Sequence, residues 1–171
     1  LKLENNQLRQ LIDEQMDSSS NLISSRVMLD KQSPYLNSFI INSGSNKEIK
    51  NGMAVLDGKN FVGRIVDVNF FSSRVLLVTD LNSKIPVIIE PNGYHAILGG
   101  TGKIEPILEF LPKNHSVELG NKVFTSGKEG IFSPGIPIGR VIQRDENFFV
   151  SLFSDTSQIS FVNINLRNRG K

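Results

Sequence analysis

The sequence contains no cysteine. A disulfide framework, a thiolate nucleophile and a cysteine-ligated zinc or iron–sulfur site are therefore excluded. Long apolar runs are also missing: none exceeds four residues, whereas a membrane-spanning helix needs about 20. Neither sign of charge predominates, because 19 Lys and Arg against 17 Asp and Glu leave a formal net charge of only +2. Arg167, Arg169 and Lys171 form only a short basic tail, so no nucleic-acid partner is expected.

The composition that remains suits a folded, water-soluble body. Of the 171 residues, 39% are hydrophobic and 21% are charged, which is enough for one or two small domains. The first residue is Leu1 rather than methionine. We therefore expect a processed or trimmed piece of a longer protein, with any signal or anchor upstream.

An amphipathic pattern opens the chain. Leu1, Leu8, Leu11 and Ile12 recur at spacings of seven, three and four residues, which predicts one apolar stripe on a helix. Two interpretations stay open: a helix that packs on its own domain, and the end of a longer coiled coil that forms a homodimer. The polar residues 17–21 break the pattern, so 1–21 are predicted to be a helix followed by a linker.

Short apolar runs separated by turn dipeptides fill the rest of the chain, and no long helical pattern appears among them. This texture predicts an all-β body whose strands close into barrels, because closure protects strand edges. The expected strands are residues 38–41, 54–56, 61–68, 74–79, 86–89, 107–110, 122–125, 137–143 and 148–153.

An internal sequence repeat divides the predicted β-structure into two parts. Residues 49–55 match 117–123, and residues 62–66 match 138–142 with the same Gly-Arg pair. A shared plan of this kind indicates two similar small barrels in tandem. Gly63 and Gly139, each inside a strand pattern, predict a bulge or a close approach of two backbones.

The expected domain boundaries follow from this internal repeat. We place a first barrel at residues 22–100, a second at 101–160 and a C-terminal tail at 161–171, with exchange of strands between the barrels allowed.

A pair of small barrels also raises the alternative of a chymotrypsin-like hydrolase, in which His, Asp and Ser converge. The inventory is thin: His95 and His115 are the only histidines, and Ser126 lacks the tight glycine turn that positions a nucleophile. Two histidines 20 residues apart, with no Asp/Glu-x-His pattern nearby, also make a poor metal site. Neither catalysis nor a cofactor is expected.

Apolar residues in turns are the candidates for a protein-binding surface. Phe70 and Phe71 are adjacent, and two neighbours in an extended strand cannot both face one core. One of them is expected at the surface, with burial on both faces or a bent turn as the alternative. Phe132, Pro134 and Ile136 form a second candidate, because two prolines stiffen their loop.

Several segments together resemble one bacterial family. They are Gly52-Met53-Ala54-Val55, Val62-Gly63-Arg64-Ile65, Ser73-Arg74-Val75-Leu76-Leu77-Val78-Thr79-Asp80, Thr125-Ser126-Gly127 and the stretch from Gly130 to Val141. In this order and spacing they are similar to the rod-shape-determining MreC family, over nearly the whole chain to about residue 155. Lys47-Glu48-Ile49 departs from the family, whose members often have an Asp-Gly turn there.

The resemblance implies the part of an inner-membrane protein that lies outside the cytoplasm: the end of a dimerising coiled coil and two small β-barrels. A single membrane helix would lie upstream of this chain. Implied function is that of a non-enzymatic scaffold of the cell-elongation machinery for peptidoglycan. Implied partners are a second copy, with a filament as the larger assembly, a class B penicillin-binding transpeptidase, MreD, MreB and RodA.

Overall fold

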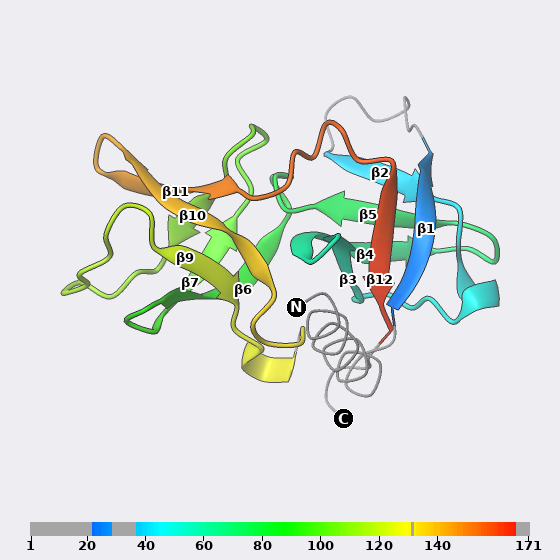
Figure 1. The fold of residues 1–171 in the computed structure, drawn as a ribbon, viewed down its shortest axis with the longest axis horizontal. Helices are drawn as coiled ribbons and strands as arrows, with labels where there is room; N and C mark the ends of the chain where they lie inside the picture. The colour runs from blue at the N-terminus through cyan, green and yellow to red at the C-terminus, as the bar shows by residue number, and fades with distance from the viewer. Residues whose placement is uncertain (1–21, 29–36, 131, 167–171) are drawn as a thin grey trace, which may run out of the picture.

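Within the residues that the computed structural model describes, 22–28, 37–130 and 132–166, the regular structure is twelve strands and two short 3-10 helices. Two closed six-stranded barrels lie side by side along the long axis of the molecule (Figure 1). The all-β, tandem-barrel expectation is confirmed. The expected helix with its leucine stripe at Leu1, Leu8, Leu11 and Ile12 lies outside the described residues, as does the basic tail at 167–171.

The first barrel is antiparallel throughout, in the order β1-β12-β3-β4-β5-β2. A short 3-10 helix, η1 (Ser45–Lys47), follows its second strand. The strands are β1 (Leu22–Met28), β2 (Ser38–Ile41), β3 (Ala54–Asp57), β4 (Asn60–Val68), β5 (Ser73–Leu77) and β12 (Phe161–Asn165).

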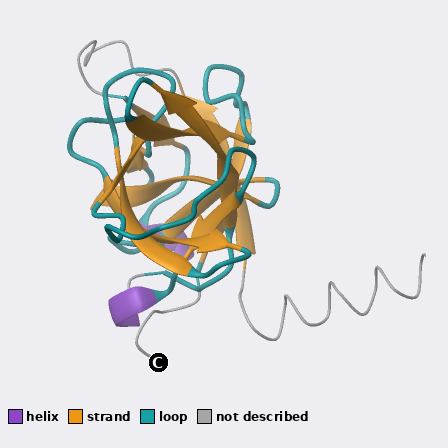
Figure 2. Cartoon of the chain, turned by 90° about the vertical axis from the view of Figure 1, so that its left-hand side faces the viewer, coloured by secondary structure: helices purple, strands orange, loops and turns teal. Residues whose placement is uncertain are grey.

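The second barrel has the order β10-β11-β8-β7-β6-β9 and is seen nearly end on in Figure 2. A 3-10 turn, η2 (Lys128–Gly130), follows β9. The strands are β6 (Lys84–Glu90), β7 (Tyr94–Gly99), β8 (Ile107–Glu109), β9 (Lys122–Thr125), β10 (Pro137–Arg144) and β11 (Asn147–Leu152).

Strand assignment differs from the boundaries that the sequence suggested. β6 and β7, expected within the first barrel at 22–100, pair inside the second barrel. β12, expected in a tail at 161–171, closes the first barrel between β1 and β3, with Asn163 opposite Leu56. The physical reason is edge protection, because without β12 the neighbouring edges of β1 and β3 would be unpaired.

Gly63 and Gly139, which correspond in the internal repeat, each lie very close to the backbone of a neighbouring strand. A Cβ at Gly63 would lie 2.4 Å from the Leu76 carbonyl oxygen, and one at Gly139 would lie 2.2 Å from that of Ser151. Register shifts interrupt the ladders of both glycine-bearing strands. The prediction of bulges and close backbone contacts is thus confirmed in both barrels.

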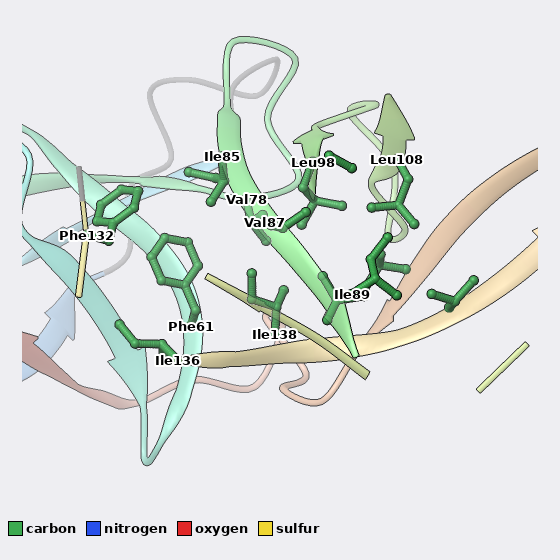
Figure 3. Close-up of a cluster of buried hydrophobic side chains, with 14 of the residues drawn as sticks. Phe61, Val78, Ile85, Val87, Ile89, Leu98, Leu108, Phe132, Ile136 and Ile138 are labelled. Atoms are coloured by element: carbon green, nitrogen blue, oxygen red, sulfur yellow. The ribbon is translucent and has the colours of Figure 1, made fainter. Parts of the chain in front are cut away.

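Buried apolar side chains form two clusters, and one of them joins the barrels. The second-barrel core continues into the first barrel through Ala54, Leu56 and Phe61. The Phe61 and Phe132 rings meet edge to face with centroids 5.1 Å apart (Figure 3). A smaller cluster fills the first barrel alone, around Val55 and Val75. The junction is therefore part of the hydrophobic core.

The chain crosses between the barrels twice, and an aspartate organises each crossing. Buried Asp80 accepts hydrogen bonds from the Asn37 N–H at 2.9 Å and the Asn82 N–H at 2.8 Å. Exposed Asp155 accepts bonds from the hydroxyl and the N–H of Ser157, which lower the pKa of its carboxyl. Both are turns in which a side chain bonds the backbone two residues on.

Candidate protein-binding surface

Phe70 and Phe71 lie at the bend between β4 and β5, in the hairpin turn at the end of the first barrel away from the second (Figure 1). Their side chains are 60% and 68% exposed, and their rings meet edge to face with centroids 4.7 Å apart. The expectation of one surface ring is exceeded, because the bent turn turns both rings outward. Exposed, adjacent aromatic side chains of this kind are typical anchors of protein interfaces.

The turn rests on a platform formed by the backbone of Gly44 and of the first two residues of η1. The N–H groups of Ser45 and Asn46 donate to the carbonyl oxygens of Asn69 at 2.9 Å and Phe70 at 3.0 Å. Gly44 lies directly beneath, where a Cβ would come within 2.0 Å of the Asn69 oxygen. Only glycine permits this approach, and the aromatic pair is thereby held in one shape before any partner arrives.

Two hydrogen bonds made by buried serine hydroxyls fix the platform to the barrel. Ser73 Oγ donates to the Ser43 carbonyl oxygen at 2.8 Å, and the Ser25 and Ser43 hydroxyls share a hydrogen bond of 2.8 Å. Glu48, at the departure from the family pattern, ends η1 in the left-handed conformation with φ 65°. The loop thus adopts the geometry that a glycine turn would favour, although it has no glycine at this position.

The proline-stiffened loop that contains Phe132, Pro134 and Ile136, by contrast, packs its apolar side chains mainly into the core. Phe132 and Ile136 are only 5% and 8% exposed and belong to the core that joins the barrels, so the expectation that they form an exposed patch is corrected. Thr125 draws the loop inward, since its hydroxyl donates to the Ser133 carbonyl at 2.7 Å and accepts from the Ile136 N–H at 3.0 Å. Pro134 alone of the three candidates is exposed.

The residues of the hydrolase alternative are engaged in separate local contacts. Ser126 Oγ accepts a hydrogen bond from the Lys128 N–H, and His115 Nδ1 accepts one from the Val117 N–H, each at 3.2 Å. His95 is exposed on β7. Within 22–28, 37–130 and 132–166, no hydrogen bond joins Ser126 to either histidine. The geometry does not favour this alternative.

In the part of the chain that the structure describes, no group of three or more His, Asp or Glu side chains could hold a metal ion, and no helix is long and apolar enough to cross a membrane. The Ser116 hydroxyl and N–H both bond the Tyr94 hydroxyl oxygen, which lowers the pKa of Tyr94. This contact ties the start of β7 to the loop that contains Ser116.

Ile104 and Phe110 are the most exposed large apolar side chains of the described chain, and the sequence did not single them out. Phe110 was expected at the end of a strand, but that strand ends at Glu109 and Phe110 takes a φ of 62°. Pro112, two residues later, was the signal that could have ended the predicted strand earlier.

The fold itself defines a class. It comprises proteins built of two six-stranded antiparallel barrels in tandem, in which a C-terminal strand returns to complete the first barrel. Residues 27–165 match the barrel core of the rod shape-determining protein MreC. The chain belongs to the MreC family.

Individual relatives support this membership. The cell shape-determining protein MreC of Cereibacter sphaeroides is 36% identical over 165 residues, which cover 96% of this chain and 55% of that protein. The chain spans about half the length of the curated relatives it matches.

Solved structures share the fold. The major periplasmic domain of the cell shape-determining filament MreC, in its monoclinic form, superimposes with a TM-score of 0.76 at 21% identity, covering 85% of this chain and 98% of that one. A complex between a penicillin-binding protein and MreC from Helicobacter pylori contains a chain that matches with a TM-score of 0.70 at 18% identity, covering 87% and 99%.

Proposed function

We propose that this chain is the part outside the cytoplasm of a non-enzymatic scaffold of the bacterial cell-elongation machinery, and that it binds and activates a class B penicillin-binding transpeptidase. The observation that carries the proposal is the exposed Phe70–Phe71 pair on its fixed turn. Support also comes from the Helicobacter pylori neighbour, which is in complex with a penicillin-binding protein. Pro134, exposed on the second barrel, is a further candidate contact.

Activation by such a scaffold needs no chemistry of its own. A scaffold that binds the active conformation of the transpeptidase more tightly than the inactive one shifts the population toward the active conformation. The turn suits this role because its shape is set by the backbone bonds from Ser45 and Asn46. Little conformational entropy is then lost on binding.

Dimerisation belongs to the same proposal. We assign it to Leu1, Leu8, Leu11 and Ile12 on the evidence of their helical spacing, with a filament as the larger assembly. A dimer presents two copies of the turn and so adds avidity. The wider proposal places the chain on the periplasmic side of the inner membrane, behind an upstream anchor, and in assembly with MreD, MreB and RodA. One structural neighbour is itself a periplasmic domain.

The test is binding of the chain to the purified transpeptidase ectodomain from the same bacterium, measured by calorimetry together with transpeptidase activity. We expect saturable binding at micromolar concentration or tighter and a rise in activity. Deletion of residues 1–16 should weaken apparent affinity through lost avidity and convert a sedimenting dimer into a monomer. If the chain still sediments as a dimer but does not bind the ectodomain, the proposed transpeptidase partner is contradicted and only the proposed self-assembly remains.

A further inference from the structure

A hollow of about 690 Å³ opens in the wall of the second barrel, between the loop that precedes β8 and the β10–β11 hairpin. Its volume lies within the range of small-molecule sites, about 300–1,000 Å³. The lining residues are Thr101, Lys103, Ile104, Glu105, Arg144, Asp145, Asn147 and Phe149. It lies on the opposite barrel from the Phe70–Phe71 turn.

The barrel creates this hollow because β8 is short. β10 and β11 pair at six positions, whereas β11 meets β8 only at Phe149 opposite Ile107. Before β8 begins, the chain turns out of the wall, where Thr101 Oγ1 donates to the Glu105 carbonyl oxygen at 2.9 Å. Next to Phe149 one further backbone hydrogen bond, from the Val150 N–H to the Pro106 carbonyl oxygen at 2.9 Å, joins the two sides of the wall. An ion pair between Arg144 and Glu105 also links them.

The charges that line the hollow balance one another. Lys103 and Arg144 supply two cations, and Glu105 and Asp145 supply two carboxylates. With no net charge, the hollow has little attraction for a polyanion or a polycation. A ligand recognised here is neutral overall and forms many hydrogen bonds, since guanidinium, carboxylate and amide groups all converge on the same space.

Apolar surface lies among these polar groups. Phe149 is half-buried and offers a flat ring, and Ile104, another lining residue, is highly exposed. A sugar ring combines an apolar face of C–H groups with a rim of hydroxyls that both donate and accept. Its apolar face matches the Phe149 ring, and adjacent hydroxyls match the planar groups of Arg144 and Asn147.

We propose that this hollow binds a neutral oligosaccharide, with a sugar ring stacked on Phe149 and its hydroxyls bonded to Arg144, Asp145 and Asn147. The proposal does not depend on the transpeptidase, because its residues and those of the aromatic turn lie on different barrels. Either can fail while the other stands.

The test is titration of the full chain with tetra-N-acetylchitotetraose and with cellotetraose, followed by backbone NMR shifts. We expect saturable shifts centred on residues 101–105 and 144–149 with at least one of the two sugars. Acetamido recognition is indicated if the chito-oligosaccharide binds more tightly. No saturable shift with either sugar at 10 mM, or shifts centred elsewhere, overturns the proposal.

Matched variants assign the contact. Phe149→Leu keeps an apolar side chain in the wall but removes the flat ring, and Asn147→Ala removes an exposed amide. Each should weaken binding at least about fivefold while thermal unfolding stays cooperative. Phe71→Leu, the same exchange on the first barrel, should leave sugar binding unchanged. Equal affinity in Phe149→Leu, Asn147→Ala and the parent overturns the assignment.

Salt dependence separates this ligand class from a charged one. A neutral sugar in a charge-balanced hollow should bind with nearly the same affinity at low and high salt. A steep loss of affinity between 50 and 500 mM NaCl would overturn the proposal, as would displacement of the sugar by a short charged peptide at equal concentration.

Discussion

The Phe70–Phe71 turn and the Phe132–Ile136 loop look alike in sequence, since both are short apolar segments among turn residues, yet they have opposite roles. Phe71 is 68% exposed on a turn at the end of the first barrel. Phe132 is 5% exposed and packs on Phe61 across the junction of the barrels. An apolar loop therefore becomes core or surface according to what the rest of the chain places against it.

The largest expected effect concerns the junction. Phe132→Ala should lower the free energy of unfolding by about 3–5 kcal/mol, because it leaves a cavity between the barrels. Phe71→Ala removes the same atoms from the surface and should change stability by less than about 0.5 kcal/mol. Denaturant unfolding of both variants checks the contrast, and equal losses would abolish it.

The platform beneath the turn gives the next effect. Gly44→Ala places a methyl group within 2.0 Å of the Asn69 carbonyl oxygen, so the backbone must shift, at a cost of about 3 kcal/mol. The turn should lose its shape, and transpeptidase binding should weaken as well. Ser45→Ala, an exposed neighbour, is the control. Unfolding and binding that match those of the parent would show that the platform does not hold the turn.

Binding should report the exposed pair itself. Phe70→Ala and Phe71→Ala are each expected to weaken binding of the transpeptidase ectodomain by about 2 kcal/mol, roughly thirtyfold. Calorimetric titration gives the dissociation constants. Pro134→Ala should have a smaller effect at an exposed position of the second barrel. A larger effect of Pro134→Ala would move the partner surface to that barrel.

The smallest effect concerns the crossing that returns the chain to the first barrel. Hydrogen bonds from Ser157 lower the pKa of Asp155 in the folded state, so its contribution to stability is present above the unfolded pKa, about 3.9. It is lost as pH falls through the folded pKa. Asp155→Asn should therefore flatten the acid limb of the stability curve slightly, as followed by thermal unfolding between pH 2 and 6. An unchanged acid limb would assign that slope to other carboxylates.

Local patterns predicted the barrels but not their strand membership. Turn dipeptides and the repeated Gly-Arg strands are short-range signals, and they are sufficient to predict two barrels. β12 was placed in a tail because its partners, Leu56 on β3 and Ser25 on β1, are more than 100 residues away in the chain. Such pairing depends on closure of the whole ring, which no local window contains.

The candidate surface was predicted in part for a similar reason. Two adjacent phenylalanines conflict with strand alternation, and that conflict correctly pointed to a surface ring at Phe70 or Phe71. Nothing local distinguishes Phe132, whose burial depends on Phe61 in the other barrel. Prolines indicated a rigid loop but carried no information about which way it faces.

Hydrogen–deuterium exchange of the chain with and without the transpeptidase ectodomain tests most directly whether the Phe70–Phe71 turn is the binding surface. Exchange reports which backbone amides a partner protects. New protection is expected at residues 44–46 and 69–72, with no change at the already buried loop around Phe132 and Ile136. Protection confined to the second barrel, with residues 69–72 exchanging as in the free chain, would contradict this assignment.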